Sequence, residues 1–189
     1  RDGFLELKAN KKGSPTVVVI TVALWLFVEL FYRIATGFDM NQFSAEDTSL
    51  LRTAVVTVAM FMMVCLSNWC ICTLMEGKGK LIDICVVGAN ALVPYIIVRF
   101  LTTILSRVFA GDEQVFLNYA VIVAELWGVL IAFIGLQEIH EYTFLKTIWA
   151  IGLTIVCLII MFFIVLMVLI LFEQLYFFIT TVAFELRYG

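Results

Sequence analysis

Long apolar runs separated by short polar stretches dominate the pattern of this chain. Residues 53–75 carry no charged side chain, the run breaks at residues 76–80 (EGKGK), and a new apolar run begins at Leu81. As a helix, the first run is about 34 Å long, enough to cross a hydrocarbon core of about 30 Å. A chain that leaves a bilayer, turns within a few residues and enters it again is a membrane protein.

The same criterion predicts five membrane spans. They comprise residues 15–35, 53–75, 81–105, 115–136 and 147–172. Runs of this length suit helices, because the strands of membrane barrels are about 10 residues long and alternate in polarity. We therefore predict an all-α fold, a polytopic transmembrane helical bundle, with residues 1–189 as a single domain. Residues 173–189 either continue the fifth helix or lie at the membrane interface.

Charges in the loops predict the orientation of the bundle. With five spans, the N-terminal segment, the 76–80 turn and the 137–146 loop lie on one side. The basic residues on that side are Arg1, Lys8, Lys11, Lys12, Lys78, Lys80 and Lys146. The basic residues on the other side are Arg52, Arg107 and Arg187. This excess places the N-terminus in the cytoplasm by the positive-inside rule.

Composition supports a chain surrounded by lipid and limits its chemistry. Hydrophobic residues make up 63% of the chain and charged residues 14%, against about a quarter in soluble domains. No basic stripe with interleaved aromatic residues occurs, which argues against nucleic-acid binding. The five cysteines all fall in predicted spans and form no CxxC pair, so we expect small buried side chains and neither a metal nor a cofactor. Because the sequence opens at Arg1, we expect the natural chain to extend further toward the N-terminus.

Ionisable residues inside a span are costly and usually face the protein interior. Arg99 in the third span and Glu125 in the fourth could approach each other if these antiparallel helices pack together. Such a pair could act as a proton or ion relay in a small carrier, or as a tether that fixes helix register; we favour the tether. Asp83 is expected to cap the third helix, and Asn90 to bond a carbonyl group or a neighbouring helix.

The sequence gives no positive indication of an enzyme. His140 is the only histidine and lies beside Glu138 and Glu141 in a short loop, where a metal site would need further ligands. We therefore expect it at the surface or the membrane interface. No GxSxG or HExxH pattern occurs, and the 77–80 segment lacks the glycine spacing and the following Ser or Thr of a phosphate loop.

Several short segments resemble the signature of the bacterial Yip-domain family, small integral membrane proteins related to the Rab/Ypt-interacting proteins of eukaryotes. The central segments are Asn68-Trp69, Thr73-Leu74-Met75, Gly77-Lys78-Gly79 and Ala91-Leu92-Val93-Pro94. Further similarity lies at Gly3-Phe4, Glu6-Leu7-Lys8, Lys12-Gly13-Ser14, Gly135-Leu136, His140, Tyr142-Thr143 and Lys146-Thr147. The resemblance covers nearly the whole chain and implies a five-helix bundle with a cytoplasmic N-terminus.

The resemblance also implies a function, although it supplies no catalytic residues. Eukaryotic members are linked to vesicle trafficking and small GTPases, whereas bacterial members tend to be encoded beside carbohydrate ABC transporters. We therefore expect a non-enzymatic scaffold or accessory subunit in the bacterial plasma membrane, bound to another integral membrane protein such as an ABC transporter subunit. Topology and anionic headgroups suffice to explain the loop lysines; the alternative is a docking face for the partner. The candidate docking residues are Lys78, Lys80, His140 and Lys146.

Overall fold

Five helices form the part of the chain that the structure describes, and each is long and apolar enough to cross a bilayer. The computed structural model describes residues 15–35, 50–109 and 113–188. The helices are α2 (Pro15–Ala35), α3 (Leu50–Leu74), α4 (Leu81–Leu105), α5 (Gln114–His140) and α6 (Phe144–Tyr188). The predicted all-α fold is confirmed, and these ranges contain no strand. The N-terminal lysines used in the orientation argument lie outside the described residues.

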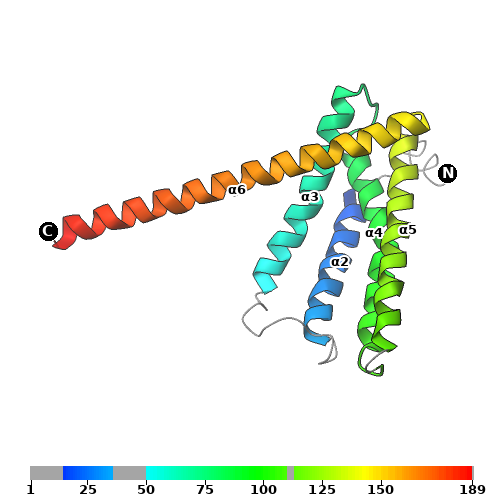
Figure 1. Ribbon diagram of the computed structural model, residues 1–189, viewed down its shortest axis with the longest axis horizontal. Helices are drawn as coiled ribbons and strands as arrows, with labels where there is room; N and C mark the ends of the chain where they lie inside the picture. The colour runs from blue at the N-terminus through cyan, green and yellow to red at the C-terminus, as the bar shows by residue number, and fades with distance from the viewer. Residues whose placement is uncertain (1–14, 36–49, 110–112, 189) are drawn as a thin grey trace.

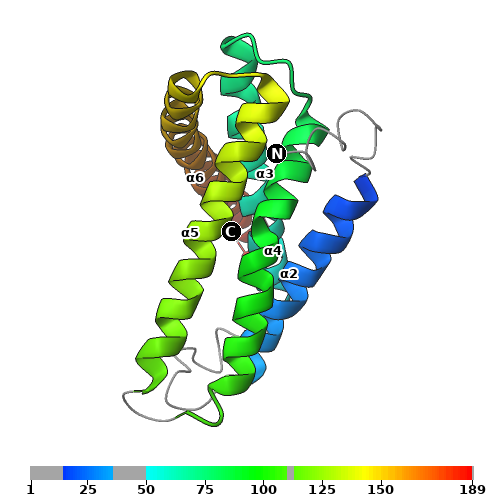
Figure 2. The same cartoon turned by 90° about the vertical axis from the view of Figure 1, so that its right-hand side faces the viewer.

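Helix α4 lies at the centre of the bundle and packs against α5, α2 and α3. In Figure 1, helices α2 to α5 run side by side, and Figure 2 shows α4 between α2 and α5. Short connections join α3 to α4 and α5 to α6 at the same end of the bundle. Because α4 contacts three helices, it contributes more buried apolar side chains than any other described helix.

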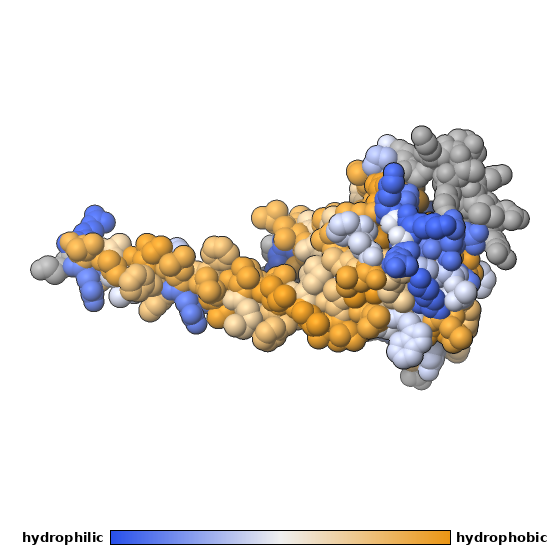
Figure 3. All heavy atoms as spheres, turned by 90° about the horizontal axis from the view of Figure 1, so that it is seen from above, coloured by the Kyte–Doolittle hydropathy of each residue, from blue (hydrophilic) through white to orange (hydrophobic). Residues whose placement is uncertain are grey.

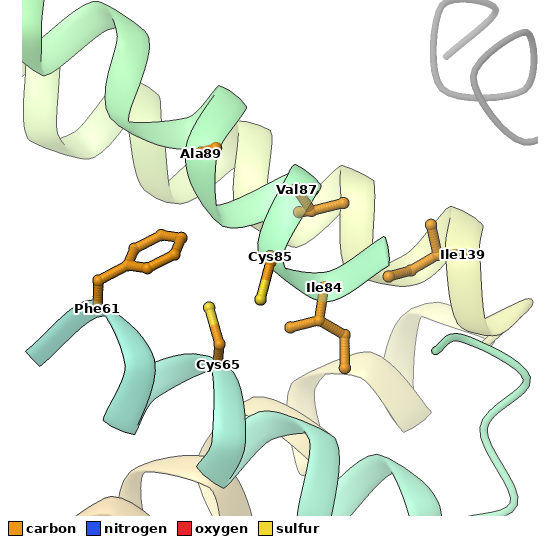
Figure 4. Close-up of a cluster of buried hydrophobic side chains, with 7 residues drawn as sticks. All are labelled: Phe61, Cys65, Ile84, Cys85, Val87, Ala89 and Ile139. Carbon is orange, nitrogen blue, oxygen red and sulfur yellow. The ribbon is translucent and has the colours of Figure 1, made fainter. Parts of the chain in front are cut away.

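The core joins α3, α4 and α5 near that end. It consists of Phe61, Cys65, Ile84, Cys85, Val87, Ala89 and Ile139, all less than one-tenth exposed (Figure 4). The side chains of Cys65 and Cys85 point toward each other across the α3–α4 contact (Figure 4). Lipid is as apolar as these side chains, so close packing rather than the hydrophobic effect stabilises this contact in a bilayer. The expectation of five buried thiols is met in part, since Cys70 is exposed and Cys157 is half-buried.

Helix α6 is much longer than the predicted fifth span. It has 45 residues and continues without a break through Tyr188, so it is about 67 Å long, roughly twice the hydrocarbon thickness. Of the two expectations for its C-terminal part, the structure shows continuation of the helix. Figure 1 shows the distal half projecting away from the other four helices.

Only the first part of α6 packs against the bundle, mainly on α3 and to a smaller extent on α5. The amide nitrogen Nδ2 of Asn68 donates a hydrogen bond to Oγ1 of Thr154 at 3.1 Å, inside the contact. Ser67, fully buried, donates to the sulfur of Met161 at 3.1 Å. Polar side chains of this kind hold membrane helices together, because an unpaired polar group in hydrocarbon is costly. These bonds fix the point from which the rest of α6 extends.

Candidate functional site

Two short connections meet at one end of the bundle. They are residues 76–80, between α3 and α4, and residues 140–146, from the last residue of α5 into the first turn of α6. We call these two segments together the clasp. Figure 3, which views the molecule from above, shows hydrophilic residues gathered over this end, while an apolar surface extends along α6.

Helices α3 and α5 end in the same backbone motif at the clasp. After α3, Glu76 has a φ of 60°, and the N–H of Gly77 donates to the carbonyl of Cys72 at 2.7 Å. After α5, Glu141 has a φ of 55°, and the next amide donates to the carbonyl of Gln137 at 3.0 Å. A left-handed residue followed by this long-range bond is the Schellman helix end, which satisfies carbonyls that the helix leaves unpaired. Both loops therefore leave their helices in a fixed direction.

The two loops then bind each other. The N–H of Gly79 donates to Nδ1 of His140 at 3.3 Å. The hydroxyl of Tyr142 donates to the carbonyl of Cys72 at 3.1 Å and to that of Met75 at 3.4 Å. The rings of His140 and Tyr142 stack with their centroids 5.2 Å apart. Residues more than sixty positions apart in the sequence thus complete each other's hydrogen bonds.

The glycines of the 76–80 turn are required by this contact. A Cβ atom on Gly77 would lie 2.6 Å from the hydroxyl of Tyr142 and also too close to Nδ1 of His140. A Cβ atom on Gly79 would lie 2.8 Å from Cε1 of His140. Real Cβ atoms essentially never approach other atoms so closely. The Gly77-Lys78-Gly79 segment is therefore shaped to admit the rings of the opposite loop.

The structure corrects the expected position of His140. We expected this residue at the surface or the membrane interface and among the candidate docking residues, but it is only 2% exposed. The reason is that α5 continues four residues past the predicted end at 136 and carries His140 beneath the 76–80 turn. His140 supports the clasp from inside and offers no surface to a partner.

The three candidate lysines remain on the outer side of the clasp. Nζ of Lys78 lies 2.6 Å from the carboxylate of Glu141, and both side chains are at least half exposed. Nζ of Lys146 lies 4.4 Å from the centre of the Tyr142 ring, a cation–π contact. Lys80 is exposed at the start of α4. The clasp thus presents three cations, of which Lys78 and Lys146 are held by contacts within the clasp.

The phenol of Tyr142 is a hydrogen-bond donor at neutral pH. Its side chain is only 7% exposed, and burial raises its pKa from about 10 to about 12, with a smaller contribution from neighbouring Cys72. The protonated form is the one that donates to the carbonyls of the 72–75 segment. In the sequence Tyr142 stands only within a segment of family resemblance, two residues from His140, and nothing there indicates its role in the clasp.

The predicted pair of Arg99 and Glu125 is not formed among the described residues. The guanidinium of Arg99 lies 3.6 Å from the centre of the Tyr32 ring on α2. Glu125 instead lines a cavity further along the same contact of α4 and α5, which Tyr95 also borders. The physical reason is that α2 packs closely on α4 and offers an aromatic face, which attracts a guanidinium.

Two further polar residues of the third span bond locally. The backbone N–H of Lys80 donates to a carboxylate oxygen of Asp83 at 3.0 Å, so Asp83 caps the start of α4. Nδ2 of Asn90 donates to the carbonyl of Val86 within the same helix at 2.8 Å. Both contacts are of the structural kind that the sequence suggested, and neither leaves its side chain directed at a ligand.

A cavity of about 490 Å³ lies at the middle of the bundle, between α3 and α5, with α4 behind it. Most of its lining is apolar, and the polar side chains in its wall are Trp25, Tyr95 and Glu125. The hydroxyl of Tyr95 donates to the carboxylate of Glu29 at 2.6 Å, whereas the buried Nε1 of Trp25 has no hydrogen-bond partner among the described residues. Trp25 and Tyr95 could not be predicted as cavity residues, because an aromatic residue in an apolar run gives no signal of its own.

The described residues include no group of three or more His, Cys, Asp or Glu side chains that could hold a metal ion. The family model of the Yip1 domain matches residues 1–184 of the chain. No curated protein and no solved structure matches it.

Proposed function

The chain belongs to the Yip1 domain family, and from this membership and the fixed surface of the clasp we propose that it is a non-enzymatic membrane scaffold or accessory subunit. It is an integral membrane protein with five apolar helices. The proposal assigns it the task of holding another integral membrane protein, with the clasp as the docking face.

One observation carries this proposal: the clasp fixes an exposed charged surface that two short loops could not otherwise hold. The pair of Lys78 and Glu141 is solvent-accessible and contributes little stability by itself, because exposed ion pairs are worth about 0–1 kcal/mol. The buried contacts of His140 and Tyr142 beneath it are what define its position. Exposed charges that buried contacts hold in place favour recognition of a partner, because the arrangement of charges on a surface determines which partner fits it.

The family resemblance suggests the kind of partner. We propose a carbohydrate ABC transporter subunit in a bacterial plasma membrane, with the clasp on the cytoplasmic side as the loop charges predict. Lysines at a cytoplasmic surface are also attracted to anionic headgroups, so the test must separate lipid from protein. The alternative of an ion carrier rests on the pair of Arg99 and Glu125, which the described contacts do not support.

The test is recovery of the partner from the native membrane. The full chain, tagged and cross-linked in cells before gentle detergent extraction, should bring down a stoichiometric integral membrane protein. Lys80→Glu should reduce that recovery at least tenfold without changing the yield of the chain, because Lys80 is exposed and its side chain supports no clasp contact. Arg187→Glu, an equal charge reversal near the far end of α6, should leave it unchanged.

Recovery of the chain alone, or equal losses in both variants, would contradict docking at the clasp. Orientation is tested separately with Lys80→Cys. A membrane-impermeant maleimide should label this variant above the level of the parent chain in inverted vesicles and not in intact cells. Labelling in intact cells would reverse the orientation.

A further inference from the structure

The cavity between α3 and α5 has the size of a small-molecule site. Binding of a ligand there would be a role separate from docking at the clasp. Its volume of about 490 Å³ lies within the range of roughly 300–1,000 Å³ that is typical of ligand sites. Three residues on its rim, Met60, Val64 and Val129, are at least 45% exposed on the lateral surface of the bundle. A molecule dissolved in the bilayer can therefore reach the cavity from the side.

Small residues of α4 and α5 create this space. A Cβ atom on Gly128 would lie 2.5 Å from the carbonyl oxygen of Ala91, so glycine is needed for the close contact of the two helices. Gly88 and Ala132 line the same cavity and also a second one of about 230 Å³, which continues toward the clasp end. The two cavities border on the same residues of α3, α4 and α5, and we call the two together the groove. Such a shape suits a single hydrocarbon chain.

Two polar side chains line the groove without a hydrogen-bond partner among the described residues. The indole N–H of Trp25 is buried without an acceptor, which is unfavourable for any buried donor. Glu125 is exposed near the middle of α5, at the depth where a carboxylate in contact with hydrocarbon is expensive. The hydroxyl of Tyr95 is already committed to Glu29. A ligand head group would satisfy both if it accepts a hydrogen bond from Trp25 and places a positive charge beside the carboxylate of Glu125.

We propose that this groove binds a single-chain amphiphile whose head carries an ammonium group beside an oxygen acceptor, as in a long-chain amino alcohol. The ammonium pairs with the carboxylate of Glu125, and the oxygen accepts from Nε1 of Trp25. The hydrocarbon chain lies along the groove past Gly88 toward the second cavity. A charge-assisted hydrogen bond in low-dielectric surroundings makes the ammonium the main determinant of affinity.

The test compares a long-chain amino alcohol with its N-acetyl derivative, which has the same chain and hydroxyl group but no charge. Both carry bromine on the chain, which quenches nearby indole fluorescence. The full chain is reconstituted in nanodiscs of zwitterionic lipid, with the exposed Trp69, Trp127 and Trp149 replaced by Phe so that Trp25 alone reports. We expect the amino alcohol to quench at a concentration about tenfold lower than its derivative.

Two variants locate the site. Glu125→Gln should remove the tenfold preference while chain binding persists, and Glu173→Gln, an exposed carboxylate on α6, should retain it. Ala132→Phe should fill the groove and abolish saturable quenching by both probes. Ala120→Phe, on an exposed face of the same helix, should leave quenching intact.

The unfolding midpoint of each variant shows that it is folded. Equal quenching by the two probes in the parent chain, or an unchanged preference in Glu125→Gln, would overturn the proposal. Loss of a copurifying partner in these variants would bear on the docking function alone.

Discussion

The clasp and the intramembrane cavity differ in whether their polar groups have hydrogen-bond partners. At the clasp, the N–H of Gly79 and the hydroxyl of Tyr142 both find acceptors on the opposite loop. At the cavity, the N–H of Trp25 has no partner among the described residues, and the exposed Glu125 belongs to a mostly apolar wall. The N–H of Trp25 and the hydroxyl of Tyr142 are both buried, so exposure does not explain the difference between these two groups.

This contrast separates polar groups that stabilise the fold, at the clasp, from polar groups that remain available for binding, at the cavity. Buried polar groups that are fully paired make a region rigid, whereas an unpaired group costs about 1–3 kcal/mol until something pairs with it. Removing a polar atom should therefore destabilise the clasp and should be tolerated at the cavity. The four predictions below test this difference, in order of decreasing effect.

The largest effect is expected from Gly77→Ala. The added Cβ atom would lie 2.6 Å from the hydroxyl of Tyr142, so the rings must move and the bond to Cys72 is lost. We expect a loss of about 3 kcal/mol in the free energy of unfolding. The measurement is SDS-induced unfolding in mixed micelles, followed with a thiol-reactive fluorophore that labels the buried Cys65 and Cys85 as they become accessible.

Gly152→Ala is the matched control for Gly77→Ala. A Cβ atom on Gly152 of α6 meets nothing within 4 Å, so this variant should be unchanged or more stable by up to about 1 kcal/mol through helix propensity. If the two alanine variants unfold alike, the clasp is not a tightly packed contact.

The second effect concerns Tyr142→Phe and its dependence on pH. At neutral pH the variant loses a hydrogen bond to a backbone carbonyl, worth about 1–2 kcal/mol. The folded-state pKa of about 12 lies above the ordinary value of 10, so the folded chain keeps a proton that the unfolded chain releases. Stability from this group is therefore complete below pH 10 and is lost as the pH rises toward 12.

Two units of pKa correspond to roughly 2–3 kcal/mol. The difference in unfolding free energy between the parent chain and Tyr142→Phe, measured from pH 8 to pH 12, should therefore shrink. A difference that stays constant over this range would show that Tyr142 does not titrate within the fold.

The contrast also explains which features the sequence could predict. Five helices follow from the length of apolar runs, because hydrocarbon demands internally paired backbone. The burial of His140 could not be predicted, since it depends on a loop some sixty residues away. The partner of Arg99 could not be predicted either, because periodicity shows which face of a helix is apolar but not which helix packs against it. Arg99 contacts an aromatic ring on α2 instead of Glu125. Glu173 ended the predicted fifth span, yet one charge does not end a helix, and α6 continues.

The third prediction tests the cavity with Trp25→Phe. The substitution removes a buried donor that has no acceptor among the described residues and keeps most of the apolar contact. The gain from removing an unpaired group offsets the loss of packing volume, so we expect a change within about 1 kcal/mol. SDS-induced unfolding without added amphiphile provides the measurement. A loss as large as that of Tyr142→Phe would show that the indole N–H is paired and would end the contrast between the two regions.

The smallest effect is expected for the ion pair of Lys78 and Glu141 on the surface of the clasp. Nζ and the carboxylate are 2.6 Å apart, but the side chains are 67% and 50% exposed, so water and salt screen their attraction. A double-mutant cycle with Lys78→Ala and Glu141→Ala should give a coupling energy of about 0.5 kcal/mol that falls further in 1 M salt. A coupling above about 2 kcal/mol that resists salt would mean that the pair is part of the buried support. If the coupling is small as expected, the cations of the clasp can be exchanged without loss of fold, as a test of partner docking requires.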